Sequence, residues 1–289
     1  MTLQEAGFYL RNQLRTVCDE GEASAIADWV METLTGSDKT ERMMYKNNAI
    51  TSAEEEQLRN YASRLLRHEP VQYVLGEAWF CGLKFYVDEH VLIPRPETEE
   101  LVEWIISNCR FPVDTLSILD IGTGSGCIPV SLKRRIRKAT VSALDISEEA
   151  LVVARKNALK LGAEVGFIQV DILNPQNWPS IPASDVIVSN PPYIPENNKA
   201  SMNPNVLEYE PHTALFVPDN DALLFYKAIA ELGKTKLNKE GLLFFEIHED
   251  LGKAVTDLLE TEGYTAEIKK DIQGKDRMVM AGKVNRLIS

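Results

Sequence analysis

The sequence predicts an α/β protein in which a small helical bundle and a β-hairpin linker precede a mostly parallel sheet. Roughly the first 75 residues have apolar positions at helical spacing and no strand pattern. From residue 115 onward, short strand-like segments alternate with helical ones. This alternation is typical of parallel sheets covered by helices on both faces.

The N-terminal region, residues 1–76, is predicted to be a bundle of about four helices. Apolar residues recur at helical spacing in segments 3–17 and 26–34. Ser52 to Glu55 has the spacing of a capping box, which predicts a helix beginning there. We find no catalytic constellation in this region.

A linker, residues 77–97, is predicted to contain a strand pair within residues 79–93, which are rich in aromatic and branched side chains. A helix then begins near Thr98, and we assign residues 98–289 to the α/β domain. Its strands are predicted at 116–121, 140–145, 165–170, 185–190 and 241–247, with a final antiparallel pair at 265–272 and 277–283. Its helices are predicted at 127–137, 148–161, 222–237 and 250–262.

The cysteine pattern and the N-terminus indicate a cytoplasmic protein. The cysteines are far apart and form no C-x-x-C pair, which argues against a disulfide framework and a zinc site; they are Cys18, Cys81, Cys109 and Cys127. The first ten residues lack the basic and apolar segments of a signal peptide. No apolar run approaches the length of a membrane span, so we expect no membrane association.

The charge balance makes nucleic acid an unexpected direct partner. The net charge is −12, and the only dense basic run is 133–138. Nucleic-acid binding normally needs a broad positive surface. The four histidines form no ligand spacing and no pair with a nucleophile, so we expect no metal site and interpret them as structural; they are His68, His90, His212 and His248.

A glycine-rich loop follows the first predicted strand of the α/β domain. Its sequence is Asp120-Ile121-Gly122-Thr123-Gly124-Ser125-Gly126. Glycines let a backbone turn sharply and approach a ligand closely. A dinucleotide fingerprint would need glycine at the position of Cys127, which argues against an oxidoreductase. The G-x-G-x-G spacing suits a neutral nucleoside with an amino-acid tail, although a tight strand-to-helix turn explains the loop equally well.

Acidic residues end the next two predicted strands. Asp145 follows the second, with Ser147 in place to cap the next helix, and Asp171-Ile172 follows the third. A carboxylate at the first position can accept both ribose hydroxyls, and the second lies where an adenine edge is expected. Asp120 could meet the ammonium group of an amino-acid tail. Each aspartate alone also fits a helix cap or a turn, but three beside one glycine loop favour a nucleoside cofactor.

The fourth predicted strand ends in Asn190-Pro191-Pro192-Tyr193. The Asn190 side-chain oxygen and the Pro191 carbonyl can accept both hydrogens of an –NH2 group, and the two prolines hold these acceptors rigid. Tyr193 offers a face for stacking a planar group, although simple packing is the alternative. We interpret Asn190, Pro191 and Tyr193 as catalytic, with Pro192 completing the substrate site.

Together, these motifs make the sequence resemble the peptide chain release factor N5-glutamine methyltransferases of the HemK/PrmC type. These are class I methyltransferases that use S-adenosylmethionine. The resemblance covers nearly the whole chain. Its motifs are the stretches 70–76 and 92–99, the glycine loop 120–126, the Asn190 segment 190–195, Tyr209-Glu210-Pro211, Ala214-Leu215 and Asp276-Arg277. The chain departs from the usual family residues at Ala222, His248 and Leu251.

The resemblance implies a Rossmann-like, seven-stranded methyltransferase domain and a helical domain that recognises the release factor. The substrate group would be the side-chain amide of the glutamine in a Gly-Gly-Gln tripeptide. The cofactor would lie against Asp120, Gly122, Thr123, Gly124, Ser125, Gly126, Asp145, Asp171, Ile172 and Asn190. The glutamine would be held by Asn190, Pro191, Pro192 and Tyr193. We expect a monomer.

Three other functions remain open at this point. Methylation of a glutamine in a ribosomal protein would use the same motif. DNA adenine methyltransferases share the Asn-Pro-Pro-Tyr tetrapeptide, although the acidic charge balance disfavours them. A sensor that binds the cofactor without transferring methyl is disfavoured, because such a protein needs no rigid amine clamp.

Overall fold

The computed structural model describes residues 1–108 and 115–283, so Cys109 and the last six residues of the predicted α/β domain lie outside the described residues. The chain divides into two compact units. We call Met1–Glu77 with Asn203–Tyr209 the helical unit, and the remaining described residues the sheet unit. None of the helices in the described ranges combines the length and apolarity needed to cross a bilayer.

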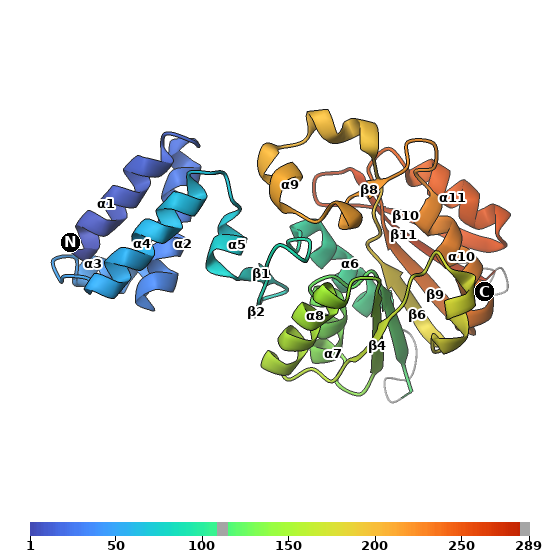
Figure 1. Cartoon of the computed structure of the whole chain (residues 1–289). Helices are drawn as coiled ribbons and strands as arrows, with labels where there is room; N and C mark the ends of the chain where they lie inside the picture. Colours follow the sequence, from blue (N-terminus) through green and yellow to red (C-terminus); the bar gives the residue numbers. More distant parts are fainter. Residues whose placement is uncertain (109–114, 284–289) are drawn as a thin grey trace. The chain divides into compact units, whose positions relative to one another are not determined.

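The helical unit contains five helices in its N-terminal part, one more than the predicted number (Figure 1). They are α1 (Leu3–Leu14), α2 (Glu20–Thr35), α3 (Lys39–Met44), α4 (Ser52–Leu65) and α5 (Val71–Leu75), and α9 (Pro204–Tyr209) completes the unit. The predicted capping box of α4 is wrong by one residue. Thr51 is the extended N-cap residue, and its Oγ1 accepts a hydrogen bond from Glu54 N at 3.2 Å.

The predicted hairpin is present but shorter than 79–93. Its strands are β1 (Ala78–Phe80) and β2 (Leu83–Phe85), joined by Cys81 and Gly82. Both turn residues have positive φ, at 49° and 72°, as the two-residue hairpin turn with right-handed twist requires. The ladder ends after β2 because Tyr86 N donates to the Asn157 side chain instead of a strand.

The seven-stranded sheet confirms the predicted fold class. Its order is β10-β11-β9-β6-β3-β4-β5, with five parallel strands and the antiparallel pair β10 and β11 at one edge. The strands are β3 (Ser117–Ile121), β4 (Thr140–Asp145), β5 (Gly166–Gln169), β6 (Ser184–Ser189), β9 (Leu237–Glu246), β10 (Tyr264–Lys270) and β11 (Asp276–Lys283). The chain runs from β3 outward through β4 and β5, then returns to β6 on the other side of β3. Such a reversal creates a crevice at the carboxyl ends of the two central strands.

Helices cover both faces of the sheet (Figure 1). On one face lie α6 (Pro96–Asn108), α7 (Cys127–Arg135) and α8 (Glu148–Lys160); on the other lie α10 (Leu224–Lys236) and α11 (Gly252–Thr261). Successive strand residues alternate between the two cores: Phe244 packs in the first and Phe245 in the second. This burial on both faces fixes the strand ends, and therefore the side chains that follow them.

The segment between β6 and α10 contains short elements that the sequence did not predict. They are the parallel pair β7 (Ile194–Pro195) and β8 (Phe216–Val217) and the 3₁₀ helices η2 (Glu196–Ser201) and η3 (His212–Ala214). A further 3₁₀ helix, η1 (Pro175–Ser180), precedes β6. Elements of two to six residues have too few positions to show a periodicity, which explains why they were missed.

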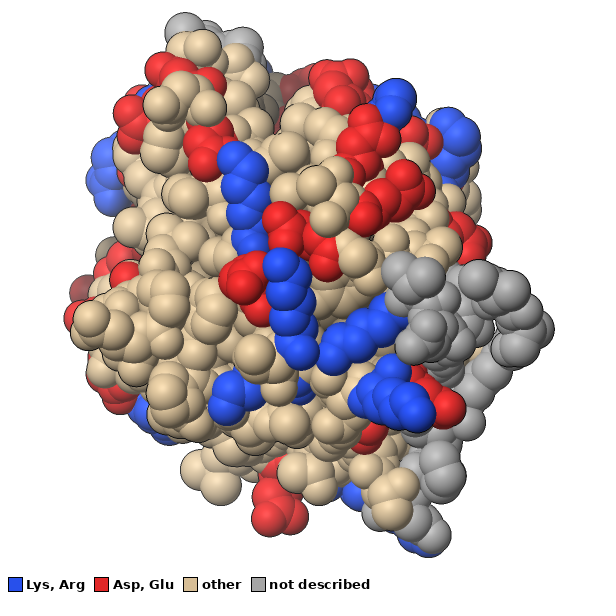
Figure 2. All heavy atoms as spheres, turned by 90° about the vertical axis from the view of Figure 1, so that its right-hand side faces the viewer, with Lys and Arg blue, Asp and Glu red and all other residues tan. Residues whose placement is uncertain are grey.

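Basic and acidic side chains are interspersed on the face shown in Figure 2. A run of basic side chains crosses the middle of this face beside Asp and Glu, and further basic side chains are scattered toward its edges. Ion pairs such as Lys234 with Glu262 and Lys253 with Asp257 occur on α10 and α11. On the described part of this face, acidic side chains therefore interrupt the basic ones.

Candidate active site

A cavity of about 340 Å³ lies in the sheet unit at the carboxyl ends of β3, β4 and β6. The predicted site residues that line it are Gly122, Gly124, Asp145, Asp171, Ile172, Asn190, Pro191 and Pro192. Asp120, Thr123, Ser125, Gly126 and Tyr193 are not among its lining residues. Most of the predicted site residues therefore meet at the carboxyl ends of the strands, where a ligand crevice is expected in a parallel sheet.

The three glycines of the loop after β3 all adopt the left-handed conformation. Gly122, Gly124 and Gly126 have φ of 75°, 51° and 78°. An added Cβ at Gly126 would lie 3.1 Å from the Cβ of Ala154, so the loop also packs tightly against α8. Side chains at these positions would strain the backbone, which explains the glycine spacing physically.

Asp145 ties this loop to the end of β4. Its Oδ2 accepts a hydrogen bond from Gly124 N at 2.8 Å, and its Oδ1 accepts one from Ser147 N at 3.0 Å. Burial raises the pKa of Asp145, while these backbone donors oppose that shift. Ser147 caps α8 as predicted, because its Oγ accepts from Ala150 N. Each carboxylate oxygen keeps a lone pair, and the residue lines the cavity.

Buried polar atoms without a partner gather beside the glycine loop. Both Asp120 carboxylate oxygens, Thr123 Oγ1 and Ser125 Oγ are buried, and the described residues supply no hydrogen-bond partner to them. Burial raises the pKa of Asp120 to about 7, and the nearby Thr123 hydroxyl opposes this rise. The two side chains do not form a hydrogen bond of good geometry with each other. Unpaired buried polar groups are costly, so this cluster suits a polar, cationic ligand group.

Asp171 and Ile172 form the far wall of the cavity. Asp171 Oδ1 accepts a hydrogen bond from Leu173 N at 2.9 Å, so it stabilises a turn as well as lining the cavity. Ile172 is buried and presents apolar surface. The apolar Ile172 suits contact with the face of a planar heterocycle, and the Asp171 carboxylate suits a hydrogen bond from its edge.

Asn190 follows β6 and faces the cavity together with Pro191 and Pro192. Its Nδ2 donates a hydrogen bond to Thr98 Oγ1 at 3.3 Å, which leaves its Oδ1 available as an acceptor. Tyr193 packs edge-to-face against His248, with 6.0 Å between ring centroids, and burial raises its pKa. Tyr193 therefore packs against the core on the α10 and α11 face of the sheet and does not line the cavity.

The linker and the segment after α9 supply cavity walls that the sequence reasoning did not assign. His90, Val91 and Leu92 line one side, and Pro211, Thr213, Ala214 and Phe216 line another. Glu210 joins these two segments, because its buried carboxylate accepts from Arg95 Nη2 at 2.5 Å and from Ile93 N at 3.3 Å. This contact brings the motifs 92–99 and 209–211 together in space.

Asn157 on α8 is a further residue that the sequence reasoning missed. The Asn157 side chain is 0% exposed. Its Nδ2 donates hydrogen bonds to Tyr86 O at 2.8 Å and to Ser125 O at 2.9 Å. Its Oδ1 accepts a hydrogen bond from Tyr86 N. It therefore connects the linker to the glycine loop. A polar residue on the buried face of α8, beside Ala154 and Ala158, was the available signal.

Asp88, Glu89 and His90 place three potential metal ligands within 4.8 Å of one another. His90 N and Nδ1 both lie 3.1 Å from Asp88 Oδ1, and Glu89 and His90 are exposed. A local turn accounts for this grouping, so it is not evidence for a metal.

Comparison with known proteins matches both parts of the chain. The family model of the PrmC N-terminal domain matches residues 5–76, and that of the methyltransferase small domain matches residues 100–208. A release factor glutamine methyltransferase of Flavobacterium psychrophilum is 43% identical over 94% of this chain and 95% of its own length. One of Bacteroides thetaiotaomicron is 42% identical over 95% of this chain and 98% of its own length.

Among solved structures, a methyltransferase from Pyrococcus furiosus superposes with a TM-score of 0.51. It is 19% identical and covers 77% of this chain and 97% of its own. At that identity the likeness concerns the fold alone.

Proposed function

The chain belongs to the family of release factor glutamine methyltransferases, and we propose that it methylates the side-chain amide nitrogen of the glutamine in the Gly-Gly-Gln tripeptide of peptide chain release factors, with S-adenosylmethionine as methyl donor. One observation carries the site assignment. A single cavity joins the glycine loop and Asp145 on one side to Asn190 and Pro191 on the other. Donor and acceptor of the methyl group need such adjacent sites.

The residues at the strand ends fit S-adenosylmethionine. Asp145 would accept the ribose hydroxyls, and Asp171 and Ile172 would meet the adenine. The orphaned polar atoms around Asp120 do not line the cavity themselves; they lie beside the lining glycines of the loop and would meet the amino-acid part. When bound, the cofactor supplies an electrophilic methyl group on a sulfonium.

Asn190 and Pro191 would hold the substrate amide. An amide nitrogen is a poor nucleophile because its lone pair is delocalised into the carbonyl. Hydrogen bonds from its two N–H groups to Asn190 Oδ1 and the Pro191 carbonyl raise its electron density and favour a pyramidal nitrogen. These fixed acceptors also face the positive charge that develops on the nitrogen, so no strong base is required.

Positioning supplies the larger share of the expected rate acceleration. Holding reactants at near-attack geometry can contribute about 7–11 kcal/mol. A fixed dipole facing developing charge contributes on the order of 3 kcal/mol. The rigid Pro191-Pro192 backbone contributes to positioning. The Asn190 oxygen contributes both to positioning and to electrostatic stabilisation.

Cofactor affinity is expected to depend on pH through Asp120. The pKa of Asp120 is raised to about 7, so below pH 7 the carboxyl must lose a proton before it can face the cofactor's ammonium group. The dissociation constant should therefore be more than about tenfold higher at pH 5.5 than at pH 7, a range in which an α-amino group stays mostly protonated. Calorimetry across this range measures it. The Asp120→Asn variant should bind more weakly with a nearly flat profile; a flat profile in the wild type would exclude this role.

The substrate assignment is tested by methyl transfer from radiolabelled S-adenosylmethionine. Unmodified release factor should be labelled, whereas a release factor with alanine in place of the Gly-Gly-Gln glutamine should not. Total ribosomal protein, incubated separately, tests the alternative substrate. Label only on a ribosomal protein would overturn the proposal, and cofactor binding without any transfer would favour a sensor.

A further inference from the structure

Two buried polar side chains that the reaction above does not use lie directly behind Asn190. Thr98, in the first turn of α6, is 3% exposed, and Glu246, the last residue of β9, is 2% exposed. Thr98 Oγ1 donates to Glu246 Oε2 at 2.6 Å and accepts from Asn190 Nδ2 at 3.3 Å. Three elements thus contribute one chain of hydrogen bonds that ends at the proposed substrate clamp.

This chain has a direction that the charge of Glu246 determines. An ionised carboxylate only accepts hydrogen bonds, and a threonine hydroxyl has a single hydrogen. With Glu246 ionised, Thr98 must donate to it and can only accept from Asn190. The NH2 of Asn190 then points to Thr98 and its oxygen points to the cavity.

Protonation of Glu246 removes this constraint. A protonated carboxyl can donate to Thr98, which can then donate to Asn190, so that the amide turns over. The NH2 of Asn190 would then face the NH2 of the substrate glutamine, and two donors would oppose each other. Only the ionised form of Glu246 therefore keeps the clamp in its accepting orientation.

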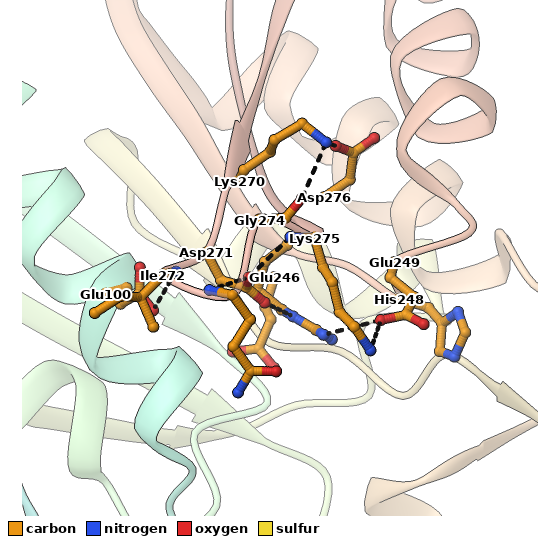
Figure 3. A network of polar contacts seen from close by, with 12 residues as sticks. Glu100, Glu246, His248, Glu249, Lys270, Asp271, Ile272, Gly274, Lys275 and Asp276 are labelled. Carbon is orange, nitrogen blue, oxygen red and sulfur yellow. Dashed lines mark hydrogen bonds and ion pairs between the residues drawn. The ribbon is translucent and has the colours of Figure 1, made fainter.

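Side chains from three neighbouring segments act on the charge of Glu246. Arg277 of β11 and the Asn190 side chain after β6 favour the ionised form, whereas Glu97 of α6 disfavours it. Arg277 is held in place, with its Nε 3.1 Å from Asp271 Oδ2 and its Nη2 3.6 Å from Glu249 Oε2. Figure 3 shows Asp271 and Glu249 around Glu246 within this network, where Lys275 also pairs with Glu249.

We propose that Thr98 and Glu246 are positioning residues that hold the Asn190 amide with its oxygen toward the substrate glutamine. This inference rests on the proposed function, because it assigns Asn190 as the acceptor for the substrate amide. It also sets a pH requirement, because burial raises the pKa of Glu246 to about 7 while Thr98 and Arg277 oppose the shift. The clamp should lose its orientation as the pH falls through that value.

The test compares Thr98→Val, Thr98→Ser and Glu246→Gln with the wild type, with Thr140→Val at the exposed start of β4 as the matched control. Turnover is measured from pH 6 to pH 8 at saturating S-adenosylmethionine and release factor, so that cofactor binding does not contribute. Thr98→Val should lower kcat about 20-fold with the cofactor dissociation constant changed less than twofold. Thr98→Ser should restore kcat to within threefold of the wild type.

The pH profile separates positioning from packing. Wild-type kcat should rise through about pH 7, and this rise should be absent in Glu246→Gln. Equal losses in Thr98→Ser and Thr98→Val would indicate packing, and either that result or a retained pH rise in Glu246→Gln would overturn the proposal. Melting temperatures within a few degrees of the wild type exclude misfolding as the cause.

A readout without turnover keeps this inference separate from the proposed function. The side-chain ¹H–¹⁵N signals of Asn190, assigned by their loss in Asn190→Ala, should shift with pH through about 7 in the wild type. They should not do so in Thr98→Val or Glu246→Gln. Unchanged titration in both variants would refute the hydrogen-bond chain, whereas absence of methyl transfer with the expected titration would refute only the proposed function.

Discussion

Replacing Asn190 with alanine is expected to lower kcat for methyl transfer about 10²- to 10³-fold, because a fixed polar group at a reacting centre contributes roughly that much to the rate. The substitution removes the side-chain acceptor that we propose for the substrate amide and leaves the glycine loop and Asp145 in place. The dissociation constant of S-adenosylmethionine should therefore change less than threefold. Single-turnover kinetics and calorimetry measure the two quantities separately.

Asn60→Ala is the matched control for this substitution, because Asn60 is exposed on α4 in the helical unit. It should leave both quantities unchanged. Parallel losses of turnover and cofactor affinity in Asn190→Ala would show that Asn190 is not mainly a substrate clamp.

Replacing Asp145 with asparagine is expected to weaken S-adenosylmethionine binding about 100-fold. Hydrogen bonds to a charged group contribute roughly 1.5–3 kcal/mol each, and 1.4 kcal/mol corresponds to a factor of about ten in affinity. The substitution replaces one acceptor oxygen with a donor and removes the charge. It also disturbs the bonds from Gly124 N and Ser147 N that shape the loop. At saturating cofactor, kcat should stay within about threefold of the wild type.

Calorimetry on Asp145→Asn and on the control Asp257→Asn measures this effect. Asp257 lies on α11, where it pairs with Lys253 on the surface. The control should bind the cofactor as the wild type does. If Asp145→Asn retained wild-type affinity, the carboxylate would serve only the loop and the ribose assignment would be wrong.

The sheet could be predicted from the sequence because its pattern is repetitive and strongly apolar. Five parallel strands and the final antiparallel pair were each bounded by clear signals, and the strand-end rule brought Gly122, Asp145 and Asn190 to one cavity. The short elements between Ile194 and Val217 have no such periodicity, so the cavity wall that they form was not foreseen.

The supporting polar contacts could not be predicted, because they join residues far apart in the sequence. In the sequence, Thr98 has the pattern of an ordinary residue in the first turn of a helix, and Glu246 has that of a polar residue at the end of a strand. Their contact with Asn190 depends on how α6 packs beside β6 and β9. Asn157 could be noticed in the sequence as a polar residue on an alanine-rich helix face. Its partners Tyr86 and Ser125 could not be predicted, because they come from distant segments.

The central claim is that this cavity methylates a glutamine side-chain amide, and mass spectrometry of the product tests it most directly. Purified enzyme and S-adenosylmethionine are incubated with unmodified release factor, and the peptide that contains Gly-Gly-Gln is fragmented. We expect a single added methyl group on the glutamine side chain, and none when Asn190→Ala replaces the wild-type enzyme over the same time. A methyl group on another residue, or an unmodified peptide with cofactor bound, would contradict the claim.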